Sequence, residues 1–212
     1  MDKNIYLFDF DNTIADSLDF WYDVMDRHTF IVFGLKPFND FKKYRQGKSN
    51  FEIAQAFIKI NNLSIPETEV INCWNRHMEQ NYLYKIKLIE GAKEYLLKLK
   101  NSGKRLVIVS ATDSELLKVA LKHFNIDIFE EIYTEANIGY PKHNPLFYKT
   151  CLKKLGAKAD DVILYEDSLV SLKSATSLGI ESNALIHKFN SSHIEELKQI
   201  CSKVIYNYNN LI

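Results

Sequence analysis

The chain has 212 residues with 27 basic and 27 acidic side chains, so its formal net charge at pH 7 is zero. This length allows one large domain, or a domain with an insertion, around a sizeable buried core. The balanced charge argues against a general nucleic-acid-binding protein, which normally carries a basic excess. No stretch approaches the roughly 20 apolar residues of a transmembrane helix. Since Met1–Lys3 leads into an apolar run rather than a signal peptide, we expect a cytoplasmic protein.

The first predicted element is a strand, Ile5-Tyr6-Leu7, that continues into Phe8-Asp9-Phe10-Asp11-Asn12-Thr13. A short, nearly continuous apolar run is typical of a parallel strand buried on both faces. If the chain stays extended, its two-residue period puts Asp9 and Asp11 on the same face. Because ligands of open α/β sheets bind beyond the carboxyl ends of the strands, this carboxylate pair is a candidate catalytic site. The same pattern also occurs in ordinary turns and helix caps.

A segment without a convincing strand pattern follows, from residue 16 to residue 84. Three amphipathic stretches predict its helices: 17–33, 51–61 and 66–84. Ser64 and Glu67 have the spacing of a capping box that would begin the third helix. The segment therefore predicts an all-helical insertion, placed directly after the first strand and above its carboxyl end.

Basic residues surround a glycine within this insertion, at 45–49. Gly47 is a candidate for shaping a substrate-specificity loop, and Arg45 or Lys48 for reaching a distal anion, since a guanidinium can bind a carboxylate or phosphate in bidentate fashion. The alternative is a solvated, charged helix end.

Other large side chains of the insertion are expected to be structural. Trp21, Phe20 and Phe51 are predicted to pack in the core of the helices rather than stack on a substrate. His28 and His77 fall on helical patterns and have the same interpretation.

From residue 85 onward, strand and helix patterns alternate. The predicted strands are Leu106–Ser110, Ile132–Thr134, Val162–Glu166 and Ser182–Ile186. Thr112 and Glu115 have capping-box spacing, which predicts the start of a helix. The alternation indicates an α/β fold with a doubly wound parallel sheet. Residues 1–15 and 85–212 are predicted to form the core domain, and residues 16–84 a helical cap domain.

Further polar groups follow the later strand patterns in a definite order. Ser110-Ala111-Thr112 ends the second apolar strand, and Lys142-His143-Asn144-Pro145 places a lysine three residues before a proline. Glu166-Asp167-Ser168 then follows another apolar strand. Taken singly, each of these groups is more simply a cap or a solvated charge.

Together the four motifs, in this order, resemble those of the haloacid-dehalogenase (HAD) superfamily, whose members are mostly magnesium-dependent phosphatases. The resemblance extends from about Asn4 to about Ile186. It implies a Rossmann-like core, and the position of the insertion is similar to that of the helical C1-type cap. Phosphoglycolate phosphatase and β-phosphoglucomutase are the most similar kinds of member.

The resemblance also implies roles for individual residues. Asp9 would be the nucleophile that forms an aspartyl-phosphate, and Asp11 the general acid and base. Mg²⁺ would be held by the carboxylates of Asp9 and Asp167 and by the backbone carbonyl of Asp11. Glu166 would be a second acidic ligand or an acceptor that orients a metal-bound water or the lysine. The phosphate would be bound by Ser110, Ala111 and Lys142.

The function expected on this basis is hydrolysis of a small phosphorylated metabolite by a monomer or homodimer, without a nucleic-acid or membrane partner. A phosphosugar mutase of the β-phosphoglucomutase type would use the same residues but return the phosphoryl group to a sugar. A response-regulator receiver also combines a phosphoacceptor aspartate, Mg²⁺, a hydroxyl and a lysine. However, its acidic pair and its acceptor lie on different strands. A catalytically silent binding protein is disfavoured because no essential group is replaced.

Overall fold

A computed structural model describes residues 3–38, 40–45 and 47–212. Its centre is a six-stranded, all-parallel sheet with the strand order β3-β2-β1-β4-β5-β6. The strands are β1 (Ile5–Phe8), β2 (Arg105–Ser110), β3 (Glu131–Thr134), β4 (Val162–Glu166), β5 (Glu181–Leu185) and β6 (Lys203–Ile205). The predicted doubly wound parallel sheet is therefore confirmed.

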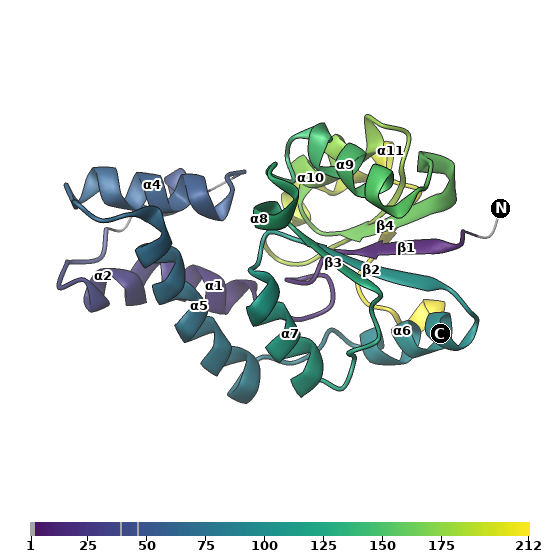
Figure 1. The fold of residues 1–212 in the computed structure, drawn as a ribbon, viewed down its shortest axis with the longest axis horizontal. Coiled ribbons are helices and arrows are strands. Elements are labelled where there is room, and N and C mark those ends of the chain that lie inside the picture. Colours follow the sequence, from purple (N-terminus) through teal and green to yellow (C-terminus); the bar gives the residue numbers. More distant parts are fainter. Residues whose placement is uncertain (1–2, 39, 46) are drawn as a thin grey trace.

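The central strands β1, β2 and β4 are mostly apolar, because both faces of the sheet are covered. Tyr6 and Phe8 belong to one buried cluster, whereas Ile5 and Leu7 belong to the cluster on the opposite face. In Figure 1, α9 and α11 lie above the sheet and α6 and α7 lie below it. The helices of these layers are α6 (Ala92–Asn101), α7 (Ser114–His123), α8 (Glu135–Ile138), α9 (Pro145–Leu155), α10 (Leu169–Thr176) and α11 (Ile194–Ile200).

The part of the chain between β1 and β2 that the structure describes contains helices and no strand. Figure 1 shows most of these helices extending to one side of the sheet, beyond the ends of the strands. Apart from α6, which lies below the sheet, they are α1 (Leu18–Asp23), a π-helical turn (Val24–His28), α2 (Thr29–Val32), α3 (Lys42–Arg45), α4 (Asn50–Ile60) and α5 (Glu67–Tyr84). The domain boundaries at 15/16 and 84/85 stay a prediction. Over the described residues, no helix combines the length and apolarity needed to cross a bilayer.

Two predicted helix starts are wrong. The N-cap of α5 is Pro66, not Ser64. A residue before proline is disfavoured in the helical region, so Ile65 cannot belong to the first turn. The N-cap of α7 is Asp113, whose carboxylate accepts from two backbone amides, rather than Thr112.

The insertion also differs from expectation in one aromatic position and one cap. Phe51 is 50% exposed instead of buried. It is the second residue of α4, which begins with a capping box between Ser49 and Glu52. Trp21 does pack in the buried cluster, as predicted.

Candidate active site

The carboxyl ends of β1, β2 and β4 meet at one edge of the sheet, where the strand order reverses around β1. This is the usual ligand position in open α/β folds. Asn12 adopts a left-handed backbone with φ 58°, which turns the chain sharply after β1. A cavity of about 770 Å³ lies between this edge and the helical insertion. It is lined by all the predicted site residues: Asp9, Asp11, Arg45, Gly47, Lys48, Ser110, Ala111, Lys142, Glu166 and Asp167.

Lys142 joins two buried carboxylates at the floor of this cavity. Its Nζ lies 2.5 Å from Asp9 Oδ1 and 2.6 Å from Glu166 Oε2. Burial, and then the charge of Glu166, raise the pKa of Asp9 to about 8. Burial alone would lower the pKa of Lys142, but Asp9 and Glu166 raise it well above its ordinary value. The lysine therefore stays protonated, and its positive charge pairs with both carboxylates.

A third carboxylate completes an acidic cluster. Ligand oxygens of Asp9, Glu166 and Asp167 lie within 4.8 Å of one another. Lys142 supplies one positive charge against these three acids, and burial raises the pKa of Glu166 as well. The partner of Glu166 Oε2 is the Lys142 ammonium, whereas Oε1 accepts the backbone N–H groups of Asp167 and Ser168. An all-oxygen donor set with excess negative charge fits a hard divalent cation such as Mg²⁺.

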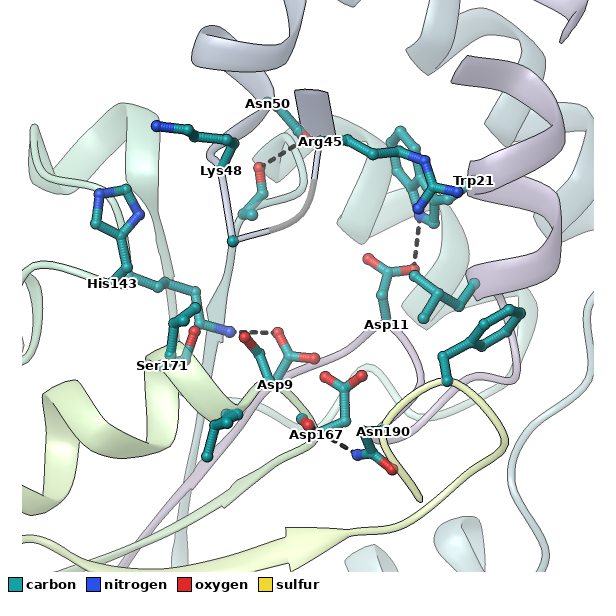
Figure 2. A pocket seen from close by; sticks show the side chains of 18 of the residues that line it. Asp9, Asp11, Trp21, Arg45, Lys48, Asn50, His143, Asp167, Ser171 and Asn190 are labelled. Carbon is teal, nitrogen blue, oxygen red and sulfur yellow. Dashed lines mark hydrogen bonds and ion pairs between the residues drawn. The ribbon is translucent and has the colours of Figure 1, made fainter. Parts of the chain in front are cut away.

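Residues of the turn after β5 form hydrogen bonds with Asp167. His187 Nε2 lies 2.8 Å from Asp167 Oδ2, while Nδ1 of the same ring accepts the backbone N–H of Phe189. This acceptor role of Nδ1 places the proton of the neutral ring on Nε2, so His187 donates to the carboxylate. The Asn190 amide donates to the backbone carbonyl of Asp167 at 2.8 Å, as Figure 2 shows.

Asp11 is surrounded by hydrogen-bond donors. Its Oδ1 accepts from Ser17 Oγ at 2.5 Å, from Trp21 Nε1 at 2.8 Å (Figure 2), and from the Tyr82 hydroxyl. Its Oδ2 accepts from Thr112 Oγ1 at 2.6 Å. Burial, and then the Asp11 charge, raise the pKa of Tyr82 well above its ordinary value, so the phenol keeps its proton. Thr112, predicted as a helix cap, instead contacts the carboxylate.

The loop after β2 supplies polar groups beside the carboxylates. Ser110 is buried at the end of β2, and its Oγ accepts the backbone N–H of Thr112 at 3.1 Å. The amide of Asn50, the first residue of α4, donates to the backbone carbonyl of Ala111 at 3.2 Å. This contact joins the helical insertion to the strand-end loop.

The predicted specificity residues lie in the cavity wall, but Arg45 and Lys48 differ in how free their charges are to bind a ligand. Arg45 binds Asp26 in bidentate fashion, at 2.9 Å and 2.8 Å, and its guanidinium lies 3.4 Å from the centre of the Tyr22 ring. Lys48 is half exposed and 3.6 Å from Glu52. Gln46, in the same predicted segment, lies outside the described residues.

Gly47 has φ 69°, and a Cβ at this position would come 3.7 Å from Val170 of α10. Gly47 therefore makes a turn in the left-handed region of backbone space, and this turn lies close to α10 of the core.

Several site residues were not found from the sequence. They are Ser17, Tyr82, Thr112, His187 and Asn190, to which Trp21 is added as a contact of Asp11. His187 follows the predicted strand 182–186, so its place at a strand end is a signal that could have identified it. Tyr82 offers no such signal, since it sits within a long amphipathic helix.

The family model described as haloacid dehalogenase-like hydrolase matches residues 6–185. The chain belongs to this family. The predicted superfamily membership and the expectation of a hydrolase enzyme are thereby confirmed. No curated protein matches the chain.

Several solved structures share the fold of this chain. CbbY from Rhodobacter sphaeroides in complex with phosphate has a TM-score of 0.84 at 17% identity, covering 99% of this chain and 96% of that one. A variant of CbbY has been solved with xylulose 1,5-bisphosphate. A predicted phosphoglycolate phosphatase from Haemophilus somnus has a TM-score of 0.75 at 16% identity, covering 99% and 96%. A candidate β-phosphoglucomutase from Thermotoga maritima has a TM-score of 0.70 at 18% identity, covering 95% and 94%.

Proposed function

We propose that the protein is a magnesium-dependent phosphomonoester hydrolase that acts on a small phosphorylated metabolite through an aspartyl-phosphate. The observation that supports this most is the contact of Asp9 with Lys142 at the floor of the cavity, beside Glu166, Asp167 and Asp11. Phosphoryl transfer needs an in-line nucleophile, compensation of the phosphoryl charge, and a proton donor for the leaving oxygen. These residues supply all three.

In the first step a carboxylate oxygen of Asp9 forms a bond to phosphorus while the bond to the leaving oxygen breaks, and Asp11 gives that oxygen a proton. In the second step Asp11 takes a proton from water, whose oxygen bonds to phosphorus and releases Asp9. Lys142, the Ser110 hydroxyl and the backbone of Ala111 bind the phosphoryl oxygens.

The metal would be held by Asp9, Asp167 and the backbone carbonyl of Asp11, with Glu166 as a ligand or as an acceptor beside them. When bound, Mg²⁺ would neutralise developing negative charge on the phosphoryl group. The excess of carboxylates over Lys142 supports this assignment.

We also propose that residues 16–84 act as a cap that recognises the leaving group. The contacts of Asn50 with Ala111 and of Lys188 with Asp19 join the insertion to both sides of the site. Within 45–49, Lys48 is the more available cation, since Arg45 is neutralised by Asp26.

The test is phosphate release from a panel of phosphorylated metabolites, with Mg²⁺ and with a chelator. We expect turnover that depends on added Mg²⁺, and an acid-stable, hydroxylamine-labile phosphoenzyme that Asp9→Asn abolishes. Full turnover in the chelator, or an unchanged Asp9→Asn variant, would contradict the proposal. Conversion of one sugar phosphate into its isomer without phosphate release would instead identify a mutase.

A further inference from the structure

Two cap side chains hold one oxygen of Asp11 and leave the other free to act. We propose that Trp21 and Tyr82 are positioning residues that saturate Asp11 Oδ1, so that the transferable proton is carried by Oδ2. This inference depends on the proposed role of Asp11 as general acid and base. It rests on the four donors around this carboxylate, three on Oδ1 and one on Oδ2.

The donors on Oδ1 leave it no lone pair for a proton. The indole N–H of Trp21 can donate but never accept, and it reaches Oδ1 at 2.8 Å. The phenol of Tyr82 and the hydroxyl of Ser17 complete the set. Trp21 and Tyr82 are buried, so water does not compete for these bonds.

Oδ2 has a different environment. Its partner is the Thr112 hydroxyl at 2.6 Å, which can rotate to donate to a carboxylate or to accept from a carboxylic acid. In the first step the Oδ2 proton passes to the leaving oxygen as the P–O bond breaks, which leaves a carboxylate. In the second step a water proton passes to Oδ2 as the water oxygen bonds to phosphorus.

The two positioning residues come from different helices of the insertion. Trp21 lies in α1, 10 positions after Asp11, and Tyr82 near the end of α5, 71 positions after it. If these helices move away from the sheet, Oδ1 loses the Trp21 and Tyr82 donors. The orientation of the acid is thereby coupled to the position of the cap.

The kinetic experiment compares Tyr82→Phe and Trp21→Phe on two substrates, p-nitrophenyl phosphate and β-glycerol phosphate. The alkyl leaving group needs protonation much more than p-nitrophenolate does. We expect kcat to fall about tenfold or more on β-glycerol phosphate and less than about twofold on p-nitrophenyl phosphate. Equal losses on both substrates would reveal a merely structural role and overturn the proposal, as would unchanged kcat on both.

Matched controls exist in the chain. Tyr95→Phe removes a buried hydroxyl that pairs with Tyr165 in the core. Trp74→Phe removes a buried indole N–H that has no hydrogen-bond partner among the described residues. Neither substitution should change the ratio of kcat on β-glycerol phosphate to kcat on p-nitrophenyl phosphate.

A readout independent of activity is the indole ¹H–¹⁵N resonance. The chain has two tryptophans, so Trp74 is an internal reference for Trp21. Asp11→Asn and Tyr82→Phe should both shift the Trp21 resonance and leave that of Trp74 in place. If the protein hydrolyses no phosphoester, the proposed function fails while these shifts still test the contact. A Trp21 resonance that is unmoved in both variants would overturn the proposal by itself.

Discussion

His187 donates from Nε2 to the Asp167 carboxylate at 2.8 Å, and its ring is oriented by the Phe189 backbone amide. A side chain that orients a metal-ligating carboxylate typically changes metal affinity about tenfold or more when removed. We therefore expect His187→Ala to raise the Mg²⁺ concentration for half-maximal activity by about tenfold, with little change in kcat at saturating Mg²⁺.

An Mg²⁺ titration of activity, together with calorimetric Mg²⁺ binding, measures this effect. His193→Ala is the matched control, because it removes another imidazole that lines the same cavity. An equal effect of the two variants would argue that His187 does not act through Asp167.

Removal of Lys142 should destabilise the fold, because Asp9 and Glu166 would remain buried without their positive partner. Breaking a buried ion pair on one side costs about 3–5 kcal/mol. We expect Lys142→Met to lower the free energy of unfolding by about this amount without metal, and by less in Mg²⁺, since the cation replaces part of the lost charge. Urea denaturation at pH 7.5 measures both values.

Lys149→Met, on the exposed side of α9, is the control for the loss of a lysine. A small loss for Lys142→Met that is the same with and without Mg²⁺ would contradict the interpretation of a shared charge site.

Substitution of Arg45 should mainly change stability, whereas substitution of Lys48 should mainly change activity. Arg45 is bidentate with Asp26 and stacked on Tyr22, so Arg45→Ala should mainly destabilise the cap. A double-mutant cycle with Asp26→Ala should give a coupling free energy of about 1–2 kcal/mol in thermal or urea unfolding. Additive effects of the two substitutions would show that the ion pair contributes little.

Lys48 is half exposed at the cavity wall. We therefore expect Lys48→Ala to weaken the interaction with the substrate rather than the stability of the cap. Its kcat/KM for the metabolite found in the panel should fall about tenfold, as for the loss of one charged contact. Hydrolysis of p-nitrophenyl phosphate should hardly change, because this substrate has no distal group. No effect on either substrate would support a solvated basic face.

Stability should depend on pH through His77, whose ring lies 3.6 Å from that of His28, centre to centre. Burial, and then the charges of His28 and Lys85, lower the pKa of His77, while Asp23 raises it. The pKa of His77 is lower in the folded state than in the unfolded state. At pH values between the two, the unfolded state therefore binds the proton more readily. The contribution of His77 to stability is therefore present above the unfolded pKa and is lost as pH falls through the folded pKa.

His77→Gln should consequently lose less Tm than the wild type between pH 7.5 and about 5. His123→Gln, at the exposed end of α7, controls for the removal of a histidine. A parallel pH dependence of the wild type and His77→Gln would contradict the prediction.

The strands and the core motifs were predictable because their signals are local. The apolar runs that became β1, β2 and β4 each end in polar residues within a few positions, and a parallel sheet places all such ends at one edge. The wrong helix starts at Ser64 and Thr112 arose from equally local patterns that neighbours overrode: Pro66 in one case, Asp113 and Asp11 in the other.

The sequence by itself determined the parallel sheet, the helical insertion after β1 and the order of the acidic, hydroxyl and lysine groups, since each depends on periodicity or spacing along the chain. Only the tertiary structure decided which side chains orient these groups. Tyr82 meets Asp11 across 71 positions, and Lys142 meets Asp9 across 133. Such contacts depend on how α5 and the strand-end loops pack against one another, and no spacing along the chain encodes that packing.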